Sequence, residues 1–335
     1  MISTNFKRAV SVLSFGLIAA AGTAQAGATL VTIDGSSTVY PVTEAVAEEF
    51  QISKKGAIRV TVGISGTGGG FKKFCRGEVD ISGASRPILK SEMEACAKAG
   101  IKYFELPVAF DAITVVVNPK NTFLNQVTVE ELKKMWEPAA QGKVAKWKDI
   151  NPAWPDLPLK LFGPGADSGT FDYFTEAVVG KAKSSRGDFT ASEDDNVLVQ
   201  GVSQDKGGLA YFGYAYYAEN MARVKAVPIV DKAGKTAVSP SMETVISGKY
   251  QPLSRPIFIY LSEKAWQRAE VKEFIAFYMN QGAKLAKEVK YVPLPAKAYE
   301  GNLEHLKKGK LGTVFGGTPE VGITIEELMK REGKL

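Results

Sequence analysis

Short apolar runs rich in β-branched residues alternate along the chain with stretches of helical periodicity. Residues 58–64, IRVTVGI, and residues 111–118, DAITVVVN, are apolar runs of strand length. By contrast, Val42, Val46 and Phe50 recur at the spacing of one helix face. Apolar strands that alternate with helices are typical of mostly parallel sheets covered by helices, so the pattern predicts an α/β fold. The other strand-like runs are residues 29–33, 159–163, 209–213, 225–230 and 255–261, and further helix-like stretches begin at Phe171 and Val271.

Two long extended segments indicate how this fold is divided. Residues 105–119 form one of them, interrupted by Pro107, and residues 249–261 form the other. If these segments lie side by side, they form a double hinge between two lobes. We then expect a first lobe built from residues 27–109 and 251–335, and a second lobe built from residues 110–250.

The first 26 residues have the pattern of a secretory signal peptide. Lys7 and Arg8 precede the apolar stretch AVSVLSFGLIAAAG, and Ala24-Gln25-Ala26 forms a cleavage site of small residues. The apolar run is short for a membrane-spanning helix. The cleavage site has no nearby cysteine that could carry a lipid anchor. We therefore expect an exported, soluble, periplasmic protein.

The charge of the mature chain is mildly positive. The formal net charge is +6, and removal of the two cations in residues 1–26 leaves +4. Lysine pairs are scattered, and no block of five like charges occurs. This distribution gives little support to nucleic-acid binding, and it is compatible with an anionic ligand.

Cysteine and histidine are scarce. In an exported chain, Cys75 and Cys96 are expected to form a disulfide closing a loop of about 20 residues, with two buried thiols as the alternative. The only histidine is His305. This inventory argues against a zinc site, and we expect neither a metal nor a cofactor.

Three loops rich in glycine and hydroxyl residues connect a predicted strand to a predicted helix: residues 33–41, 63–74 and 163–171. The first N–H groups of a helix are unpaired and lie at its positive end, and glycine lets a ligand approach the backbone closely. Taken singly, Ser37 or Ser168 would be an ordinary helix cap, and GTGGG would be a flexible turn. Together the three loops predict convergence on one anion.

A fourth loop, residues 80–88, adds charged side chains. Arg86 is expected to give an oxyanion two parallel hydrogen bonds. Asp80 would accept the proton that phosphate carries and that sulfate lacks near neutral pH, which would discriminate between the two anions. The alternative is a surface ion pair between Asp80 and Arg86.

Catalysis by Ser168 is the main alternative from another class of function. ADSGT at residues 166–170 resembles the sequence around a serine-protease nucleophile, but such a serine needs a base, usually histidine. His305 lies far downstream in NLEHLKKGK. We therefore expect no enzymatic activity, with a phosphatase or other hydrolase as the less favoured alternative. The sequence also leaves open a second role as a surface adhesin.

The motifs DGSSTVYP, SGTGGGFKKF, DISGASRPI and GADSGTFDYF, with residues 195–217, resemble the periplasmic phosphate-binding component of the Pst ABC transporter. The resemblance covers nearly all of the mature chain. It implies a two-lobed type II periplasmic-binding-protein fold with a two-segment hinge. It also implies delivery of inorganic phosphate to a membrane permease and its ATPase, by a protein that we expect to be a monomer. Receptors for sulfate or arsenate are the nearest alternatives.

The resemblance also implies a set of phosphate contacts. One departure is Pro164, which stands where some members of the family have an anion-binding arginine, and we expect Arg86 to replace that arginine. Asp167 is expected to order its loop from behind the contacts, or to act only as a helix cap. The expected contacts are Ser37, Thr38, either or both of Ser65 and Thr67, Asp80, Arg86, Ser168, Gly169 and Thr170.

Overall fold

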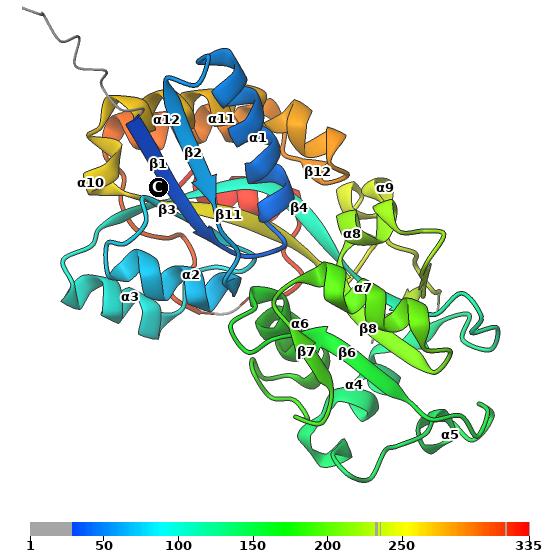
Figure 1. Ribbon diagram of the computed structural model, residues 1–335. Helices are drawn as coiled ribbons and strands as arrows, with labels where there is room; N and C mark the ends of the chain where they lie inside the picture. Colours follow the sequence, from blue (N-terminus) through cyan, green and yellow to red (C-terminus); the bar gives the residue numbers. More distant parts are fainter. Residues whose placement is uncertain (1–28, 232–233, 235, 319, 335) are drawn as a thin grey trace, which may run out of the picture.

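The structure is a computed structural model that describes residues 29–231, 234, 236–318 and 320–334. The predicted signal peptide, residues 1–26, lies outside the described residues. The described chain forms two lobes, the first built from its two ends and the second from its middle (Figure 1). Two long strands run between the lobes.

The sheet of the first lobe combines parallel and antiparallel pairs. Strand β1 lies between β2 and β3 and pairs with both in parallel, and β11 then pairs antiparallel with β3 and with β4. The short β12 pairs with β4 near the middle of that strand. The bounds of these strands are β1 (Thr29–Gly35), β2 (Ile58–Val62), β3 (Ile81–Ala84), β4 (Tyr103–Val117), β11 (Ser254–Ser262) and β12 (Val292–Pro293).

The second lobe continues the same sheet through β4. Strand β8 pairs antiparallel with β4, and β6 and β7 follow in parallel. Strands β5 and β10 form a separate parallel pair. The bounds are β5 (Val127–Thr128), β6 (Lys160–Pro164), β7 (Thr190–Ser192), β8 (Gly208–Gly213), β9 (Lys225–Ala226), which also pairs with β4, and β10 (Ile229–Val230). The predicted α/β class is confirmed.

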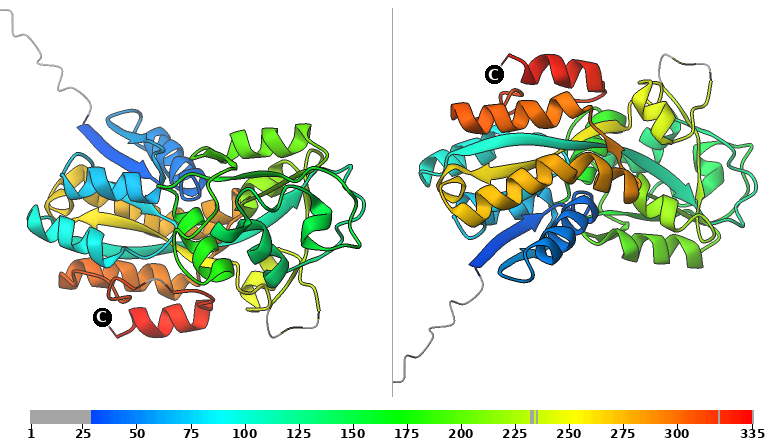
Figure 2. Two further views of the ribbon diagram at one scale, coloured as in Figure 1. Left: turned by 90° about the horizontal axis from the view of Figure 1, so that it is seen from below. Right: turned by 90° about the horizontal axis from the view of Figure 1, so that it is seen from above.

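Helices cover the sheet of each lobe, and α12 and α13 lie side by side along one side of the first lobe (Figure 2). The first lobe carries α1 (Tyr40–Ser53), α2 (Gly66–Cys75), α3 (Lys90–Lys98), α10 (Glu263–Trp266), α11 (Ala269–Glu288), α12 (Ala296–Lys308) and α13 (Ile325–Glu332). The second carries α4 (Val129–Trp136), the 3-10 helix η1 (Pro138–Ala140), α5 (Trp147–Ile150), α6 (Gly169–Val179), α7 (Asp195–Gln204), α8 (Tyr214–Glu219) and α9 (Met242–Ile246).

The helical periodicities seen in the sequence correspond to buried faces. Val42, Val46 and Phe50 of α1 are fully buried. In α6, Phe174 stacks on Tyr211 of β8 with ring centroids 3.7 Å apart, which fixes the helix against its sheet. Burial of such faces supplies most of the stability of a helix in a protein.

The two predicted hinge segments lie side by side. Strand β4 is buried along its whole length and pairs with β11 from Tyr103 to Ala112, then with β8 from Ile113 to Val117. It therefore passes from the sheet of the first lobe into that of the second. The chain returns through β11, which pairs with β4 along all nine of its residues.

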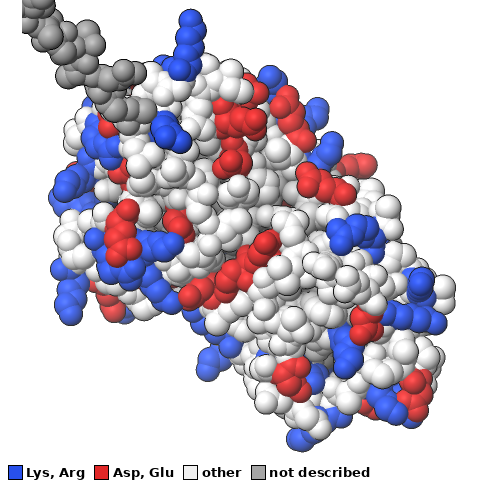
Figure 3. All heavy atoms as spheres, in the orientation of Figure 1, with Lys and Arg blue, Asp and Glu red and all other residues white. Residues whose placement is uncertain are grey.

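The predicted disulfide is confirmed. Cys75 and Cys96 are bonded and join the end of α2 to α3. No helix among the described residues is both long enough and apolar enough to cross a membrane. On the face shown in Figure 3, basic and acidic side chains are interspersed.

Candidate functional site

Buried hydroxyl groups from four chain segments meet at the junction of the lobes. Thr38 comes from the loop between β1 and α1, Thr67 from the first turn of α2, and Thr170 from the first turn of α6. The Thr38 and Thr170 hydroxyl oxygens are 2.9 Å apart, and the Ser85 hydroxyl lies 3.2 Å from that of Thr67 and accepts from Ser36 at 2.9 Å. All five side chains are buried. We name Ser36, Thr38, Thr67, Ser85 and Thr170 the hydroxyl cluster.

Gly169 allows α6 to approach the first lobe this closely. A Cβ atom at this position would lie 2.4 Å from the Thr67 hydroxyl oxygen and 2.6 Å from that of Ser85. No side chain larger than hydrogen fits in this arrangement. The glycine therefore brings the positive end of α6 to the cluster.

Arg255 of β11 is the cation of the site. Its side chain is 0% exposed. Nη2 donates to the Thr170 hydroxyl at 2.7 Å and lies 3.3 Å from that of Thr38, and Nη1 donates to the Gly169 carbonyl at 3.2 Å. Asp111 of β4, directly opposite in the strand pairing, accepts from Nη2 at 3.0 Å. The guanidinium thus joins hinge strands to the loops of both lobes.

Arg255 was missed in the sequence, where RPIFIYL indicated only a strand. An arginine at the start of an otherwise apolar, buried strand is unusual, because burying a charge without a partner is costly. That signal could have identified it. Its partner Asp111 likewise begins the apolar run DAITVVVN.

A second buried carboxylate, Asp195 at the start of α7, was also missed. Its Oδ1 accepts from the Ser37 hydroxyl at 3.5 Å, while Oδ2 has no hydrogen-bond partner among the described residues. Burial, and then the charge of Asp111, raise the pKa of Asp195 to about 7. An acceptor oxygen without a donor therefore lies next to the Ser37 loop.

Ser37 and Ser168 are buried beside the cluster. The Ser37 carbonyl accepts from the Tyr216 hydroxyl at 3.0 Å. The Ser168 hydroxyl accepts from the backbone N–H of Thr170 at 3.1 Å, so Ser168 is the N-cap of α6. The capping interpretation of Ser168 is therefore right in this structure, and the residue still lies at the junction.

Of the two hydroxyls in the second loop, the structure brings Thr67 to the cluster. The Ser65 side chain is only partly buried and donates to Asp34 instead. Asp167 is near the surface, where its carboxylate pairs with Lys72 at 2.7 Å and its carbonyl accepts from the Gly68 N–H at 2.7 Å. It thus fastens the α6 loop to α2.

Asp80 lies away from the cluster, contrary to our expectation. The loop predicted over residues 80–88 contains the whole of β3, so Asp80 precedes this strand while Ser85 and Arg86 follow it. Asp80 pairs with Arg268 at 2.7 Å and accepts from the Thr32 N–H at 2.9 Å. Ser85 of the hydroxyl cluster follows the carboxyl end of β3, whereas Asp80 lies at the amino end of this strand.

Arg86 is close to the cluster in sequence but is not directed into it. It is 3% exposed, and Nε donates to Asp172 of α6 at 2.7 Å. Nη1 and Nη2 donate to the two oxygens of Glu92 at 2.8 and 2.7 Å. Because its donors are directed to carboxylates, Arg86 does not replace the anion-binding arginine that some family members have at the position of Pro164. Arg255 occupies the centre instead.

No histidine lies beside Ser168 to act as its catalytic base. His305, the only histidine, is in α12, where its Nδ1 lies 3.7 Å from Glu332 of α13. Both helices belong to the first lobe. The arrangement at the junction can hold a small oxyanion by hydrogen bonds and one guanidinium, and it lacks the serine–histidine pair of a hydrolase.

Comparisons with known proteins identify the family of the chain. Residues 20–281 match the family model described as the PBP superfamily domain. Protein SphX of Synechococcus elongatus is 55% identical over 310 residues, which are 92% of this chain and 91% of that protein. The phosphate-binding protein PstS of Staphylococcus saprophyticus is 40% identical over 269 residues, 79% of this chain and 81% of that protein.

Solved structures are similar over most of the chain. One, described as a possible phosphate binding protein from Planctomyces limnophilus, is 50% identical, with a TM-score of 0.62 over 84% of this chain and 99% of that one. Another, a phosphate ABC transporter substrate-binding protein with bound phosphate from Clostridium perfringens, is 26% identical. Its TM-score is 0.66 over 80% of this chain and 100% of that one. The chain therefore belongs to the PBP superfamily, in one family with protein SphX and the phosphate-binding protein PstS.

Proposed function

We propose that this protein binds inorganic phosphate in the periplasm and delivers it to an ABC-type importer, without catalysing a reaction. The observation that carries the proposal is the buried Arg255, whose guanidinium meets hydroxyls of both lobes at the start of α6. The names of its relatives support phosphate as the anion. Phosphate would be held dehydrated between the lobes, by one cation and many neutral donors.

The proposed contacts modify those expected from the sequence. Arg255 replaces Arg86, and the hydroxyl groups of Ser36 and Ser85 are added. Ser65 and Asp80 are left out because their side chains bind elsewhere. The proposed set is Ser36, Ser37, Thr38, Thr67, Ser85, Ser168, Gly169, Thr170 and Arg255, with Asp167 behind it.

Closure of the lobes would complete this set of donors. We keep the proposed division into residues 27–109 with 251–335 and residues 110–250, with β4 and β11 as the hinge. Thr38 and Thr170 then belong to different lobes, and their hydroxyl oxygens are 2.9 Å apart in this structure, so a phosphate bound to both would hold the two loops together. Such closure is a common response of hinged binding proteins.

Asp195 supplies the selectivity that we first attributed to Asp80. Its Oδ2 is buried and lacks a donor among the described residues. A phosphate that carries a proton could donate to it, whereas sulfate would meet an unpaired carboxylate. Export through the signal peptide at residues 1–26, a monomeric state, and transfer to a permease and its ATPase complete the proposal.

Isothermal titration of the mature protein with phosphate tests this function. We expect tight binding by the wild type and at least about tenfold weaker binding by Thr170→Val, because the variant keeps the shape of the side chain but loses a buried hydroxyl. Thr61→Val, at an exposed position of β2, is the matched control and should bind as the wild type does. Absence of binding heat in the wild type at millimolar phosphate would sink the proposal.

Two further measurements on the same protein distinguish the alternative functions. Sulfate that bound as tightly as phosphate would favour a receptor for another oxyanion. Turnover of a phosphate ester that disappeared in Ser168→Ala would favour a hydrolase, and neither result is expected.

A further inference from the structure

We propose that Arg86 and Asp172 form a clasp between the lobes, which holds the closed state and thereby slows the release of the anion. This inference rests on the proposed function. It assigns Arg86 a positioning role in place of the direct contact that the sequence suggested.

The pair crosses the junction of the lobes in a buried environment. Arg86 follows β3 of the first lobe, and Asp172 lies in α6 of the second. The two side chains are 4% and 2% exposed, and the Nε to Oδ2 distance is 2.7 Å. Lys183 is 3.9 Å from Asp172 and half exposed, so Arg86 is the nearer and better shielded cation.

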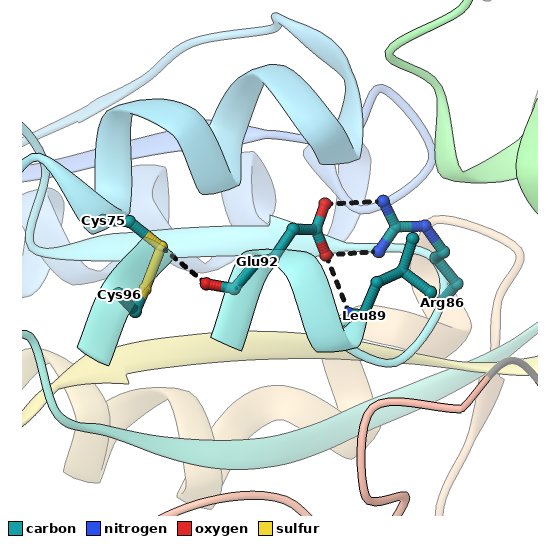
Figure 4. The surroundings of a disulfide bond; sticks show 5 residues. All are labelled: Cys75, Arg86, Leu89, Glu92 and Cys96. Carbon is teal, nitrogen blue, oxygen red and sulfur yellow. Dashed lines mark hydrogen bonds and ion pairs between the residues drawn. A yellow bond between two sulfur atoms is a disulfide. The ribbon is translucent and has the colours of Figure 1, made fainter. Parts of the chain in front are cut away.

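Arg86 is held ready by its own lobe. Glu92 of α3 binds both terminal nitrogens of the guanidinium and also accepts from the Leu89 N–H at 2.8 Å, so one carboxylate caps the helix and orients the arginine. Figure 4 shows this arrangement and the Cys75–Cys96 disulfide beside it. The disulfide ties α3 to α2, and the Cys75 sulfur lies 3.5 Å from the Glu92 carbonyl.

The clasp is built on two of the four segments that form the hydroxyl cluster. Arg86 directly follows Ser85 of the cluster, and Asp172 is two residues beyond Thr170. Movement that brings Thr170 to the first lobe therefore brings Asp172 to Arg86. Separation of the lobes would break the Arg86–Asp172 contact. It would leave the Arg86–Glu92 pair intact, because Arg86 and Glu92 both lie in the first lobe.

The surroundings of Arg86 favour a clasp over a second anion site. Two carboxylates, Glu92 and Asp172, already approach the guanidinium, and a third anion there would be repelled. A charge pair that forms only in the closed state stabilises that state relative to the open one. It should act mainly on the dissociation rate, as buried charge pairs at interfaces do.

Stopped-flow and titration measurements of phosphate binding test the clasp. Asp172→Asn keeps the shape of the side chain and the Arg86–Glu92 pair. We expect its phosphate dissociation rate to rise about tenfold to a hundredfold, with the association rate within about twofold of the wild type. Arg86→Gln should behave similarly, and the double variant should be no worse than the worse single variant.

Asp188→Asn is the control, because it breaks an arginine pair, with Arg186, that lies within the second lobe. Its dissociation rate should match the wild type. Melting curves identify variants that do not fold, and either single variant suffices if the other fails. Dissociation rates within twofold of the wild type, or additive effects in the double variant, would overturn the clasp.

Small-angle scattering separates this failure from failure of the proposed function. With phosphate present, Asp172→Asn should have a larger radius of gyration than the wild type. A wild type that binds no phosphate would defeat the proposed function. In that case, equal radii for wild type and Asp172→Asn would also overturn the clasp.

Discussion

Arg255 and Arg86 are both buried, but their neighbours give them different roles. Arg255 has one carboxylate partner, Asp111, and directs its remaining donors to hydroxyl and carbonyl groups. Arg86 is held between the carboxylates of Glu92 and Asp172. Arg255 can therefore exchange hydroxyl and carbonyl partners for a bound anion, whereas Arg86 is already paired with two carboxylates.

The sequence could identify Thr38, Thr67 and Thr170 of the hydroxyl cluster, but not Ser36, Ser85 or the buried cation Arg255. Thr38, Thr67 and Thr170 each lie at the start of a helix, which is a local pattern that can be read from neighbouring residues. Arg255 reaches them from a strand more than 80 residues away from Thr170 in the chain, and no local pattern marks that contact. Asp80 was expected near these hydroxyls because a strand was predicted to end within residues 80–88, whereas β3 (Ile81–Ala84) separates Asp80 from Ser85 and Arg86.

At this scale we predict that Asp195 sets the preference for phosphate over sulfate. Because its pKa is raised to about 7, the carboxyl is protonated below that pH, where it can also donate to sulfate, and it is an acceptor above it. The ratio of the two affinities should rise from pH 6 to pH 8. In Asp195→Asn the ratio should be lower by about tenfold or more and should lose this rise.

Titration calorimetry with both anions at each pH measures the ratio. Asp194→Asn is the comparison variant: it keeps an N-cap on α7 but removes a charge that raises the pKa of Asp195, so the rise of the ratio should move to lower pH without disappearing. An unchanged ratio in Asp195→Asn would show that another group makes the discrimination.

At the scale of elements, apolar periodicity was a reliable guide where burial was regular. The faces predicted for α1 and α6 are buried, and the runs predicted as strands contain strands. The run at residues 225–230 differs, because it is divided into β9, which pairs with β4, and β10, which pairs with β5. The short β3 was not predicted as a strand because ISGA has a single β-branched residue, Ile81, followed by three small residues, and its pairing with β1 and β11 completes the strand. Strand formation of this kind depends on distant partners.

The connection between α2 and α3 gives a prediction at this scale. Replacing both Cys75 and Cys96 by serine should lower the free energy of unfolding by about 2–4 kcal/mol, because the unfolded chain is no longer constrained by the loop. Urea unfolding followed by circular dichroism measures this difference. Equal unfolding midpoints for the oxidised and the fully reduced wild type would contradict it.

At the scale of the whole molecule, the two-lobed plan followed from a simple property of the sequence. The segments at 105–119 and 249–261 are too long and too apolar for ordinary loops, and they pair with each other in the structure. The way in which the lobes bring four separate loops together could not be derived in the same way. It depends on the packing of complete sheets and helices.

Buried carboxyl groups make the stability of the molecule depend on pH. Glu332 of α13 is nine-tenths buried, and neither of its oxygens has a hydrogen-bond partner among the described residues. Burial, and then the charge of Glu105, raise its pKa to about 8. The folded state therefore binds this proton more tightly than the unfolded state, so the resulting stability is present at low pH and is lost as the pH rises through about 8.

We predict that the Glu332→Gln variant loses less folding stability than the wild type as the pH rises. Between about pH 5 and pH 8 the wild-type free energy of unfolding should fall by about 1.4 kcal/mol per pH unit from this group alone, and the variant should lack that contribution. Chemical unfolding at several pH values provides the measurement, with Glu326→Gln on the exposed face of α13 as the control. Parallel pH profiles for wild type and Glu332→Gln would refute the prediction.

The pairing of β4 with β11 has a consequence for the path of the ligand. Both chain crossings lie next to each other and are joined by backbone hydrogen bonds, so that flank of the molecule stays shut however the halves swing. Parting of the lobes would instead break contacts between α2 and the loop before α6, such as Lys72–Asp167 and Gly68–Asp167. Under the proposed function, phosphate would enter and leave past these contacts, and the importer that receives it would have to bind the protein there.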